Sequence, residues 1–367
     1  MTEPHDLLTL SKIELRELVM AWGEPGYRAA QLDRWLYQEL ATDFGAMTDL
    51  PRALRAQLRE RAYVGALTQV AETVSADGLT RKALLQLNDQ HTIETVLMLY
   101  LDAAGGEAAL PTPLPERRTV CVSTQVGCPI GCPFCATGQA GYVRNLTSGE
   151  IVAQVLHFAR AVRPAALTNV VVMGMGEPFM KFAVTWQALE TLCDPARFAL
   201  GARRITVSTA GEIPGIEQMM REPLQINLAI SLHAPDDALR DQLVPLNRKY
   251  PLRDLLRAVK AYTAETRRRV TFEYALMDGV NDAPDQARAL AQLLRGMLCH
   301  VNLIPLNPTR ASPYGRASPE RVAQFESILR AANIPTTLRV EKGIAIAAGC
   351  GQLRSSQRMG NELSRSH

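Results

Sequence analysis

The sequence predicts an α/β protein in which a partial (β/α)6 barrel of the TIM type follows a small helical domain. From about residue 119, strand-like and helix-like segments alternate regularly through six strands. Before that point, residues 1–66 carry helical patterns. Alternating strands and helices form a parallel sheet, and curling the sheet into a partial barrel closes its core. A chain of 367 residues that is 47% hydrophobic can bury such a core together with an appended domain.

The helical domain over residues 1–66 is predicted to contain three helices. The first lies in SKIELRELVMAWG, where Ser11 and Glu14 form a capping box and apolar residues follow in helical spacing. YRAAQLDRWLYQEL repeats that period, and LPRALRAQLRERAYV begins a third helix after Pro51. The predicted exposed faces carry several arginines: Arg28, Arg34, Arg52, Arg55, Arg59 and Arg61.

Residues 67–118 predict a β-hairpin followed by a linker. Two strand-like runs, KALLQL and HTIETVLMLY, flank a turn-like segment at residues 88–90. The stretch AAGGEAALPTPLPER, residues 103–117, is rich in Ala, Gly and Pro and indicates a flexible connection.

The barrel is predicted over residues 119–340. Its strands lie in TVCVST, NVVVMG, RRITVST, QINLAISL, RRVTFEYALM and HVNLIPLN, with amphipathic helices such as PLRDLLRAVKAYTAE between them. Ser318 is expected to cap the last helix, with Pro319 at its first position. Residues 341–367 are predicted to form a loop and a polar tail, RSSQRMGNELSRSH.

Charge, leader and cysteine content limit the class of protein. Lys and Arg number 40 against 37 Asp and Glu, so the overall balance does not by itself indicate a polyanionic partner. The start, MTEPHDLLTL, lacks the basic and apolar regions of a secretory signal, and no apolar run reaches the roughly 18 residues of a membrane span. We therefore expect a protein of the reducing cytoplasm, without a membrane partner, whose seven cysteines are ligands or reactants rather than staples.

Three cysteines form the most informative motif. Cys128, Cys132 and Cys135 have the spacing C-x3-C-x2-C in CVSTQVGCPIGCPFCATGQAGYVRN, directly after the first barrel strand. One loop with this spacing can wrap an iron–sulfur cubane, and such clusters usually have four thiolate ligands. Three thiolates leave one iron open for a substrate. In radical enzymes that substrate is S-adenosylmethionine (SAM), so the motif predicts a 4Fe–4S cluster that cleaves SAM.

A zinc site is the alternative interpretation of the same cysteines. Cys121 lies just before the motif and would complete a tetrahedral set of four thiolates. Zinc sites usually pair two C-x2-C knuckles, whereas here three cysteines lie within eight residues. Barrel active sites lie at the carboxyl ends of the strands, so the position of the motif favours catalysis.

Polar residues follow several of the predicted strands. In GMGEP, Gly176 permits a close approach of the backbone to a ligand, and Glu177 offers a carboxylate that suits an ammonium group. Later strands end in four more polar residues: Ser208, Ser231, His233 and Asn307. Each alone is more often a turn or cap residue. Together they are expected to converge at the barrel mouth.

The C-x3-C-x2-C loop resembles that of radical SAM enzymes, and its surroundings resemble the RlmN/Cfr family of adenine methyltransferases. The resemblance covers nearly the whole chain, including the N-terminal helical domain. It rests on these segments in order: GYVRNLTSGEIVAQV, VVVMGMGEP, ITVSTAG, LAISLHAPDD, LVPLNRKYPL, LMDGVND, NLIPLNP and AAGCGQL. It implies a radical SAM core, a cluster held by the three motif cysteines, and a set of SAM-binding residues: Gly176, Glu177, Ser208, Ser231, Leu232, His233 and Asn307.

The resemblance also implies a methyl transfer to carbon 2 of an adenine that uses two SAM molecules per turnover. One SAM methylates Cys350. Cleavage of the second gives a 5′-deoxyadenosyl radical, which removes a hydrogen from the S-methyl group, and the methylene radical adds to the adenine. Glu94 then removes the ring proton, and Cys121 resolves the adduct through a transient disulfide with Cys350. This route avoids the need for a nucleophilic ring carbon. Cys193 and Cys299 are expected to be structural.

RNA is the implied partner. The arginines of the helical domain, with Arg248 and Lys249, are candidates for phosphate contacts, although a solvated helix face explains the same charges. Base chemistry requires an unpaired or extruded adenine. The resemblance implies 23S ribosomal RNA and certain tRNAs as substrates, and an electron donor such as flavodoxin or ferredoxin.

Ala345 departs from the family pattern. It stands in EKGIAIAAGCGQL where the family has an acidic residue, and Gly349 replaces the Ala expected before the cysteine. Three alternatives therefore stay open: methylation at carbon 8, as in Cfr, a radical SAM paralogue with another RNA substrate, and a zinc-stabilised RNA-binding protein without catalysis.

Overall fold

The structure, a computed structural model, describes these residues: 3–65, 67–101, 116–307, 309, 312–339 and 343–354. Most of the predicted linker over 103–117 and nearly all of the predicted polar tail lie outside the described residues.

The N-terminal module contains the three predicted helices, α1 (Lys12–Ala21), α2 (Arg28–Asp33) and α3 (Arg52–Arg61). The capping box is present, because Ser11 Oγ accepts the Glu14 N–H at 3.2 Å and the Glu14 carboxylate accepts the Ser11 N–H at 2.8 Å. The second helix continues into a π-helical turn, Arg34–Gln38. Shorter elements complete the module: β1 (His5–Asp6), β2 (Ala62–Tyr63), and 3-10 turns at Leu7–Thr9 and Phe44–Ala46.

The six predicted barrel strands are present: β6 (Arg117–Cys121), β9 (Asn169–Val172), β10 (Ile205–Thr209), β11 (Asn227–Ser231), β12 (Val270–Leu276) and β13 (Cys299–Pro305). They lie side by side in this order, and all pair in parallel. A further parallel strand, β14 (Thr336–Leu338), pairs with β13 at the edge. It was not predicted because three residues, two of them exposed, show no strand pattern. The predicted α/β barrel core is confirmed.

The predicted hairpin belongs to the same sheet. Its strands β4 (Thr80–Gln86) and β5 (Thr92–Tyr100) are antiparallel, and β5 pairs antiparallel with β6, where Val96 lies opposite Cys121. A third strand, β3 (Thr68–Val74), pairs with β4 at the outer edge. It is mostly exposed and was not predicted. The hairpin therefore extends the barrel wall instead of forming a separate unit.

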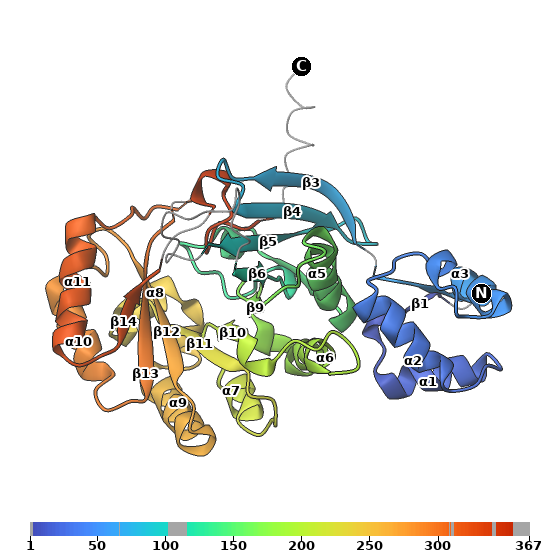
Figure 1. Cartoon of the computed structure of the whole chain (residues 1–367). Coiled ribbons are helices and arrows are strands. Elements are labelled where there is room, and N and C mark those ends of the chain that lie inside the picture. The colour runs from blue at the N-terminus through green and yellow to red at the C-terminus, as the bar shows by residue number, and fades with distance from the viewer. Residues whose placement is uncertain are drawn as a thin grey trace, which may run out of the picture.

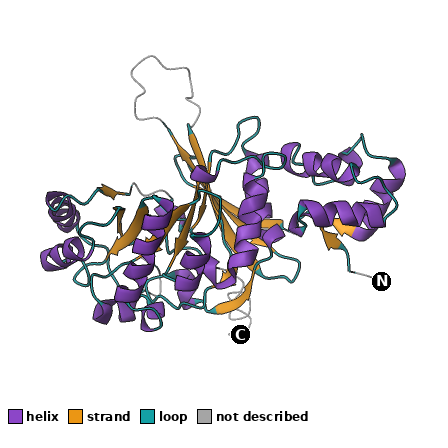
Figure 2. Ribbon diagram, turned by 90° about the horizontal axis from the view of Figure 1, so that it is seen from below, coloured by secondary structure: helices purple, strands orange, loops and turns teal. Residues whose placement is uncertain are grey.

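Helices cover the outer side of the curved sheet (Figure 1; Figure 2). Their bounds are α5 (Ser148–Ala161), α6 (Phe182–Cys193), α7 (Ile213–Met219), α8 (Asp237–Leu243), α9 (Leu252–Thr266), α10 (Pro284–Leu293) and α11 (Pro319–Ala331). The predicted cap of the last helix is present, because Ser318 Oγ accepts the Arg321 N–H at 3.3 Å. Further 3-10 turns lie at Ala202–Arg204 and Pro245–Arg248. In the described part of the chain, no helix has the length and apolar character needed to cross a membrane.

A buried ion pair joins the N-terminal module to the barrel. Arg197 Nε lies 3.0 Å from Asp33 Oδ1, and the two side chains are 3% and 8% exposed. Arg197 also donates to the Leu10 carbonyl at 3.1 Å, and Lys12 donates to Asp194 at 2.7 Å. These contacts hold the module against the α5 and α6 side of the barrel (Figure 1).

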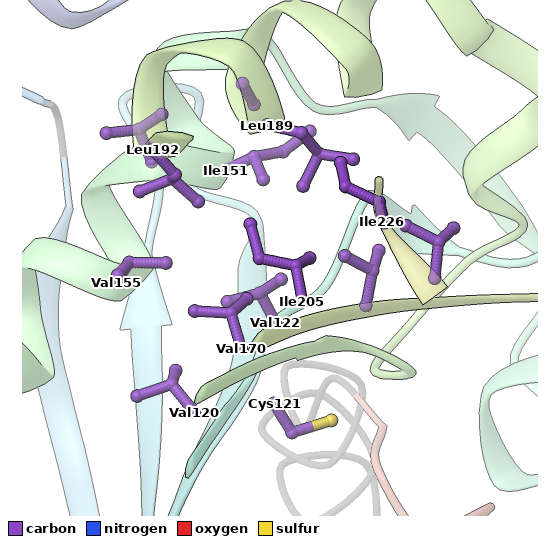
Figure 3. Packing of buried hydrophobic residues seen from close by; sticks show 14 of the residues in the cluster. Val120, Cys121, Val122, Ile151, Val155, Val170, Leu189, Leu192, Ile205 and Ile226 are labelled. Carbon is purple, nitrogen blue, oxygen red and sulfur yellow. The ribbon is translucent and has the colours of Figure 1, made fainter. Parts of the chain in front are cut away.

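Strand alternation along β6 separates the core from the barrel interior. Val120 and the following Val122 point into the apolar layer beside Ile151 and Val155 of α5 (Figure 3). Cys121 points to the opposite side of the sheet (Figure 3). The two valines therefore stabilise the wall, while the thiol between them faces the interior.

Candidate active site

The three-cysteine loop is anchored at both ends. It lies between two short antiparallel strands, β7 (Gln125–Gly127) and β8 (Tyr142–Asn145), and contains the single-turn helix α4 (Ala136–Gln139). Inside it, the Cys135 N–H donates to the Cys132 carbonyl at 3.1 Å. Gly138 packs so tightly that a Cβ there would lie 2.8 Å from Cys132 N. The loop needs glycine at that position to keep its turns together.

Cys128, Cys132 and Cys135 line one end of a cavity at the carboxyl ends of the barrel strands, here called the main cavity. Burial raises the pKa of the Cys128 thiol to about 12 and also raises the pKa of the Cys132 thiol, and the neighbouring sulfurs add to both shifts. Three buried thiolates are stable only beside positive charge, which the irons of a 4Fe–4S cluster supply. Among the described residues, no three His, Cys, Asp or Glu side chains form a single-ion site.

Cys121 does not line the main cavity. It is the only residue that the sequence offered as a fourth thiolate for zinc, so this placement argues against the four-cysteine zinc interpretation. The three motif cysteines fit the iron–sulfur interpretation.

Most of the residues predicted to bind SAM line the main cavity. Gly176 and Glu177 follow β9, and the others come from later strand ends: Ser208, Ser231, His233 and Asn307. Leu232 is the exception. Its side chain is 0% exposed within the core, and it does not line the cavity. The structure therefore brings together six of the seven predicted residues beside the three cysteines.

Glu177 is a buried carboxylate at the edge of this cavity. Its oxygens accept the Ala210 N–H at 2.7 Å and the Phe179 N–H at 3.2 Å. Burial raises the pKa of Glu177 to about 7, although these backbone donors act in the opposite direction. Gly176, at φ +108, lies where a Cβ would meet Gln125 at 2.7 Å. The backbone turn that presents Glu177 therefore requires glycine.

His233 and Asn307 differ in what they can offer a ligand. His233 Nδ1 accepts the Ala275 N–H at 3.0 Å, and burial lowers the pKa of His233 to about 3, so the ring is neutral. Asn307 Nδ2 donates to the Cys350 carbonyl at 3.3 Å, while its buried Oδ1 has no partner among the described residues. An unpaired buried acceptor is costly, and a donor on SAM would satisfy it.

A smaller cavity next to the main one is lined by both Cys121 and Cys350. Cys350 lines the main cavity as well, so it alone of the two faces both spaces. Both thiols are free. Burial raises the pKa of Cys121 to about 12, and Cys350 adds to this shift, whereas the Arg339 guanidinium opposes it.

Glu94 lines neither cavity. Its carboxylate lies 2.9 Å from Lys82 Nζ and accepts the Arg354 N–H at 2.7 Å. Burial raises the pKa of Glu94, while Lys82 lowers it. The predicted proton acceptor is therefore covered by the C-terminal loop in this structure. Ala345, at the departing family position, is exposed in the 3-10 turn Ile344–Ile346.

Arg339 and Glu273 are charged cavity residues that the sequence analysis missed. Both line the main cavity, and their side chains lie 3.9 Å apart. Glu273 also accepts from Asn302 at 3.2 Å. The pKa of Arg339 is raised, chiefly because its guanidinium lies near the Cys350 sulfur. The sequence did contain a signal for Glu273, because it is the single acidic residue in the otherwise mostly apolar strand VTFEYAL, and buried acidic residues are rare.

The barrel, the three-cysteine loop and the cavity at the strand ends define a radical SAM enzyme. Residues 122–291 match the model of the Radical SAM superfamily, and residues 5–64 match that of the ribosomal RNA large subunit methyltransferase N-terminal domain. A radical SAM methyltransferase from Sphaerobacter thermophilus, known from its crystal structure, has 53% sequence identity to this chain. The two structures superpose with a TM-score of 0.90, and the match covers 96% of this chain and 99% of that chain.

Curated relatives agree with these matches. A probable dual-specificity RNA methyltransferase RlmN from Chloroflexus aurantiacus is 52% identical over 93% of this chain and 90% of its own length. The ribosomal RNA large subunit methyltransferase N of Nitrosopumilus maritimus is 46% identical over 95% of this chain and 98% of its own. The chain belongs to the RlmN family of radical SAM RNA methyltransferases. Membership implies a 4Fe–4S cluster and SAM.

Proposed function

We propose that this enzyme methylates carbon 2 of an adenine in 23S ribosomal RNA, and in tRNA, through an S-methylcysteine at Cys350. The observation that carries the proposal is the position of Cys350, which lines both the cavity of the three cysteines and the cavity of Cys121. A methyl group on this sulfur would stand between the place where SAM binds and the second thiol. The relatives named as dual-specificity and ribosomal RNA methyltransferases support RNA as the substrate.

Cys128, Cys132 and Cys135 would hold the cluster. With two SAM molecules per turnover, the cluster would supply the methyl group and a carbon radical. A one-electron donor such as flavodoxin or ferredoxin would reduce the cluster. Gly176, Glu177 and the polar strand-end residues would bind SAM, with Glu177 accepting its ammonium group.

The protein's own residues would complete the transfer. Glu94 would take the proton from the adenine ring. Burial raises the pKa of Glu94, although Lys82 opposes the shift, and a raised pKa makes it a stronger base than an exposed carboxylate. The Cys121 thiolate would attack the Cys350 sulfur. Removal of the ring proton restores the aromatic ring only if one electron also leaves, and the cluster held by the motif cysteines would accept it. As the disulfide then forms, the bond between the Cys350 sulfur and the transferred carbon breaks with its electron pair on the carbon, which takes up a proton and becomes the methyl group of the released RNA.

Part of the predicted RNA surface is occupied by contacts within the module. Arg34 pairs with Asp49 at 2.9 Å, and Arg55 donates to the Gly45 carbonyl at 2.9 Å. Arg52 and Arg61, by contrast, have exposed side chains. These two side chains are the better candidates for phosphate contacts in the proposed complex.

Nucleoside mass spectrometry tests the proposal. RNA incubated with the anaerobically reconstituted enzyme, SAM and reductant should contain 2-methyladenosine. 8-Methyladenosine would instead support the Cfr-like alternative, and a product without methyladenine would refute both. The enzyme should also contain about four iron and four sulfide per chain. Zinc without iron would support the non-catalytic RNA-binding alternative.

A further inference from the structure

Lys82 connects the hairpin to the loop that carries Cys350. Its Nζ lies 2.9 Å from Glu94 Oε1 and donates to the Ala347 carbonyl at 3.1 Å. The side chain projects from β4, and Glu94 lies on the neighbouring strand β5. The ammonium and carboxylate are 14% and 8% exposed, so solvent screens this pair only weakly. This ion pair fixes the Lys82 side chain, which in turn binds the loop at the Ala347 carbonyl.

The second oxygen of Glu94 binds the same loop further along. Oε2 accepts the Arg354 N–H at 2.7 Å, so the pair holds the segment 343–354 at Ala347 and at Arg354, on either side of Cys350. Both oxygens of the carboxylate are therefore engaged while the loop is in place. A carboxylate oxygen that accepts one hydrogen bond keeps a second lone pair, but it can act as a base only where the substrate comes within hydrogen-bond reach, and here the loop backbone lies against Oε2.

We propose that Lys82 is a positioning residue that couples the availability of Glu94 as a base to the position of the Cys350 loop. This inference rests on the proposed function of Glu94. When segment 343–354 withdraws, Oε2 loses the Arg354 N–H and becomes free to accept a proton. Lys82 remains bound to Oε1 and keeps the carboxylate ionised and correctly oriented. The base is thus covered while Cys350 faces the main cavity and becomes exposed only after the loop has moved.

Hydrogen exchange measures this coupling without requiring methylation. The Arg354 amide is the donor to Glu94, so peptides within 343–354 report directly on the closed loop. In the reconstituted full-length enzyme, Lys82→Met should speed exchange in this segment about tenfold, the effect expected when one charge-assisted hydrogen bond of the closed state is lost. Lys82→Arg, which keeps the charge, should restore most of the protection.

A neighbouring arginine provides the matched control. Arg81 lies next to Lys82 on the same strand, but it pairs with Glu72 of β3 at 2.9 Å, on the side of β4 away from Glu94. Arg81→Met should leave exchange in 343–354 unchanged. Glu94→Gln should speed it, and the effects of Lys82→Met and Glu94→Gln should be less than additive in the double variant, because each change also breaks the ion pair that the two residues share.

Two outcomes would overturn the inference. One is exchange in Lys82→Met within twofold of the wild type. The other is additive effects of Lys82→Met and Glu94→Gln. If Lys82→Met does not fold, the same comparison is made with Lys82→Gln. A wild-type enzyme that produces no methyladenine would refute the proposed function, while the exchange result would still decide whether the pair holds the loop.

Discussion

The Ala136 backbone N–H donates to the Gly351 carbonyl at 2.7 Å, which ties the residue after Cys135 directly to the residue after Cys350. The next residue repeats the pattern, because Thr137 Oγ1 donates to the Leu353 carbonyl at 2.6 Å. The loop of the proposed cluster and the loop of the proposed methyl acceptor therefore form one hydrogen-bonded unit. Two segments more than 200 residues apart in the chain are therefore held in register by one bond between backbone groups and by one bond from the Thr137 hydroxyl.

Cys350→Ala should abolish RNA methylation and leave SAM cleavage intact. The variant loses the only proposed methyl acceptor, whereas the three motif cysteines and the polar strand ends of the main cavity are unchanged. We expect no detectable methyladenosine together with 5′-deoxyadenosine near the wild-type level, both measured by mass spectrometry. Cys193→Ala, on α6 and in neither cavity, is the control. Retained methylation in Cys350→Ala would refute the mechanism.

Cys121→Ala should trap a covalent adduct between the protein and RNA. Without the second thiol, the bond between Cys350 and the transferred carbon has no partner to break it. A labelled RNA that migrates with the protein on a denaturing gel would show the adduct, and its loss in the Cys121→Ala, Cys350→Ala double variant would assign the attachment point. If Cys121→Ala turns over normally, another group must resolve the adduct.

Arg339→Met should slow the release of that adduct. Burial raises the pKa of Cys121 to about 12, and the Arg339 charge acts against this shift. Loss of one nearby opposite charge raises a thiol pKa further by about one unit, which lowers the thiolate fraction about tenfold. We therefore expect roughly tenfold slower adduct decay at pH 8 in a single-turnover assay. Arg339→Lys, which retains a cation, should decay faster than Arg339→Met, and equal rates in the two variants would exclude a charge effect.

The hydrophobic pattern and the strand-end rule were enough to predict the barrel and much of the lining of the main cavity. The alternation in TVCVST separates Val120 and Val122 from Cys121, and parallel strand ends necessarily meet at one mouth. Arg339 and Lys82 could not be found in this way. Their roles depend on where the C-terminal loop folds back over the sheet, and loop positions are set by long-range contacts that leave no local periodicity. Leu232 differs from its two neighbours, Ser231 and His233, because they line the cavity while its own side chain is buried in the core.

Asp33→Ala should destabilise the protein by about 3 kcal/mol, because it leaves the buried Arg197 guanidinium without its carboxylate. Urea unfolding measures this change. The control is Lys12→Ala, which breaks a pair whose lysine is 46% exposed and should cost less than about 1 kcal/mol. Asp33→Leu combined with Arg197→Met should recover part of the loss, since apolar side chains of similar volume need no partner. Equal costs for Asp33→Ala and Lys12→Ala would mean that the buried pair does not stabilise the junction.

SAM binding should weaken as the pH falls through neutrality, because Glu177 must be ionised to attract the ammonium group. Burial raises the pKa of Glu177 to about 7, so the carboxylate is mostly ionised at pH 8 and mostly protonated at pH 6. If the ionised form alone binds, the dissociation constant should rise by roughly tenfold between these values. His233 does not account for such a change, since burial lowers its pKa to about 3 and it stays neutral throughout. Equilibrium binding of SAM to the reconstituted enzyme from pH 6 to 8 measures the effect. Glu177→Gln should bind weakly and show a flat profile, and a profile as steep as that of the wild type would assign the titration to another group.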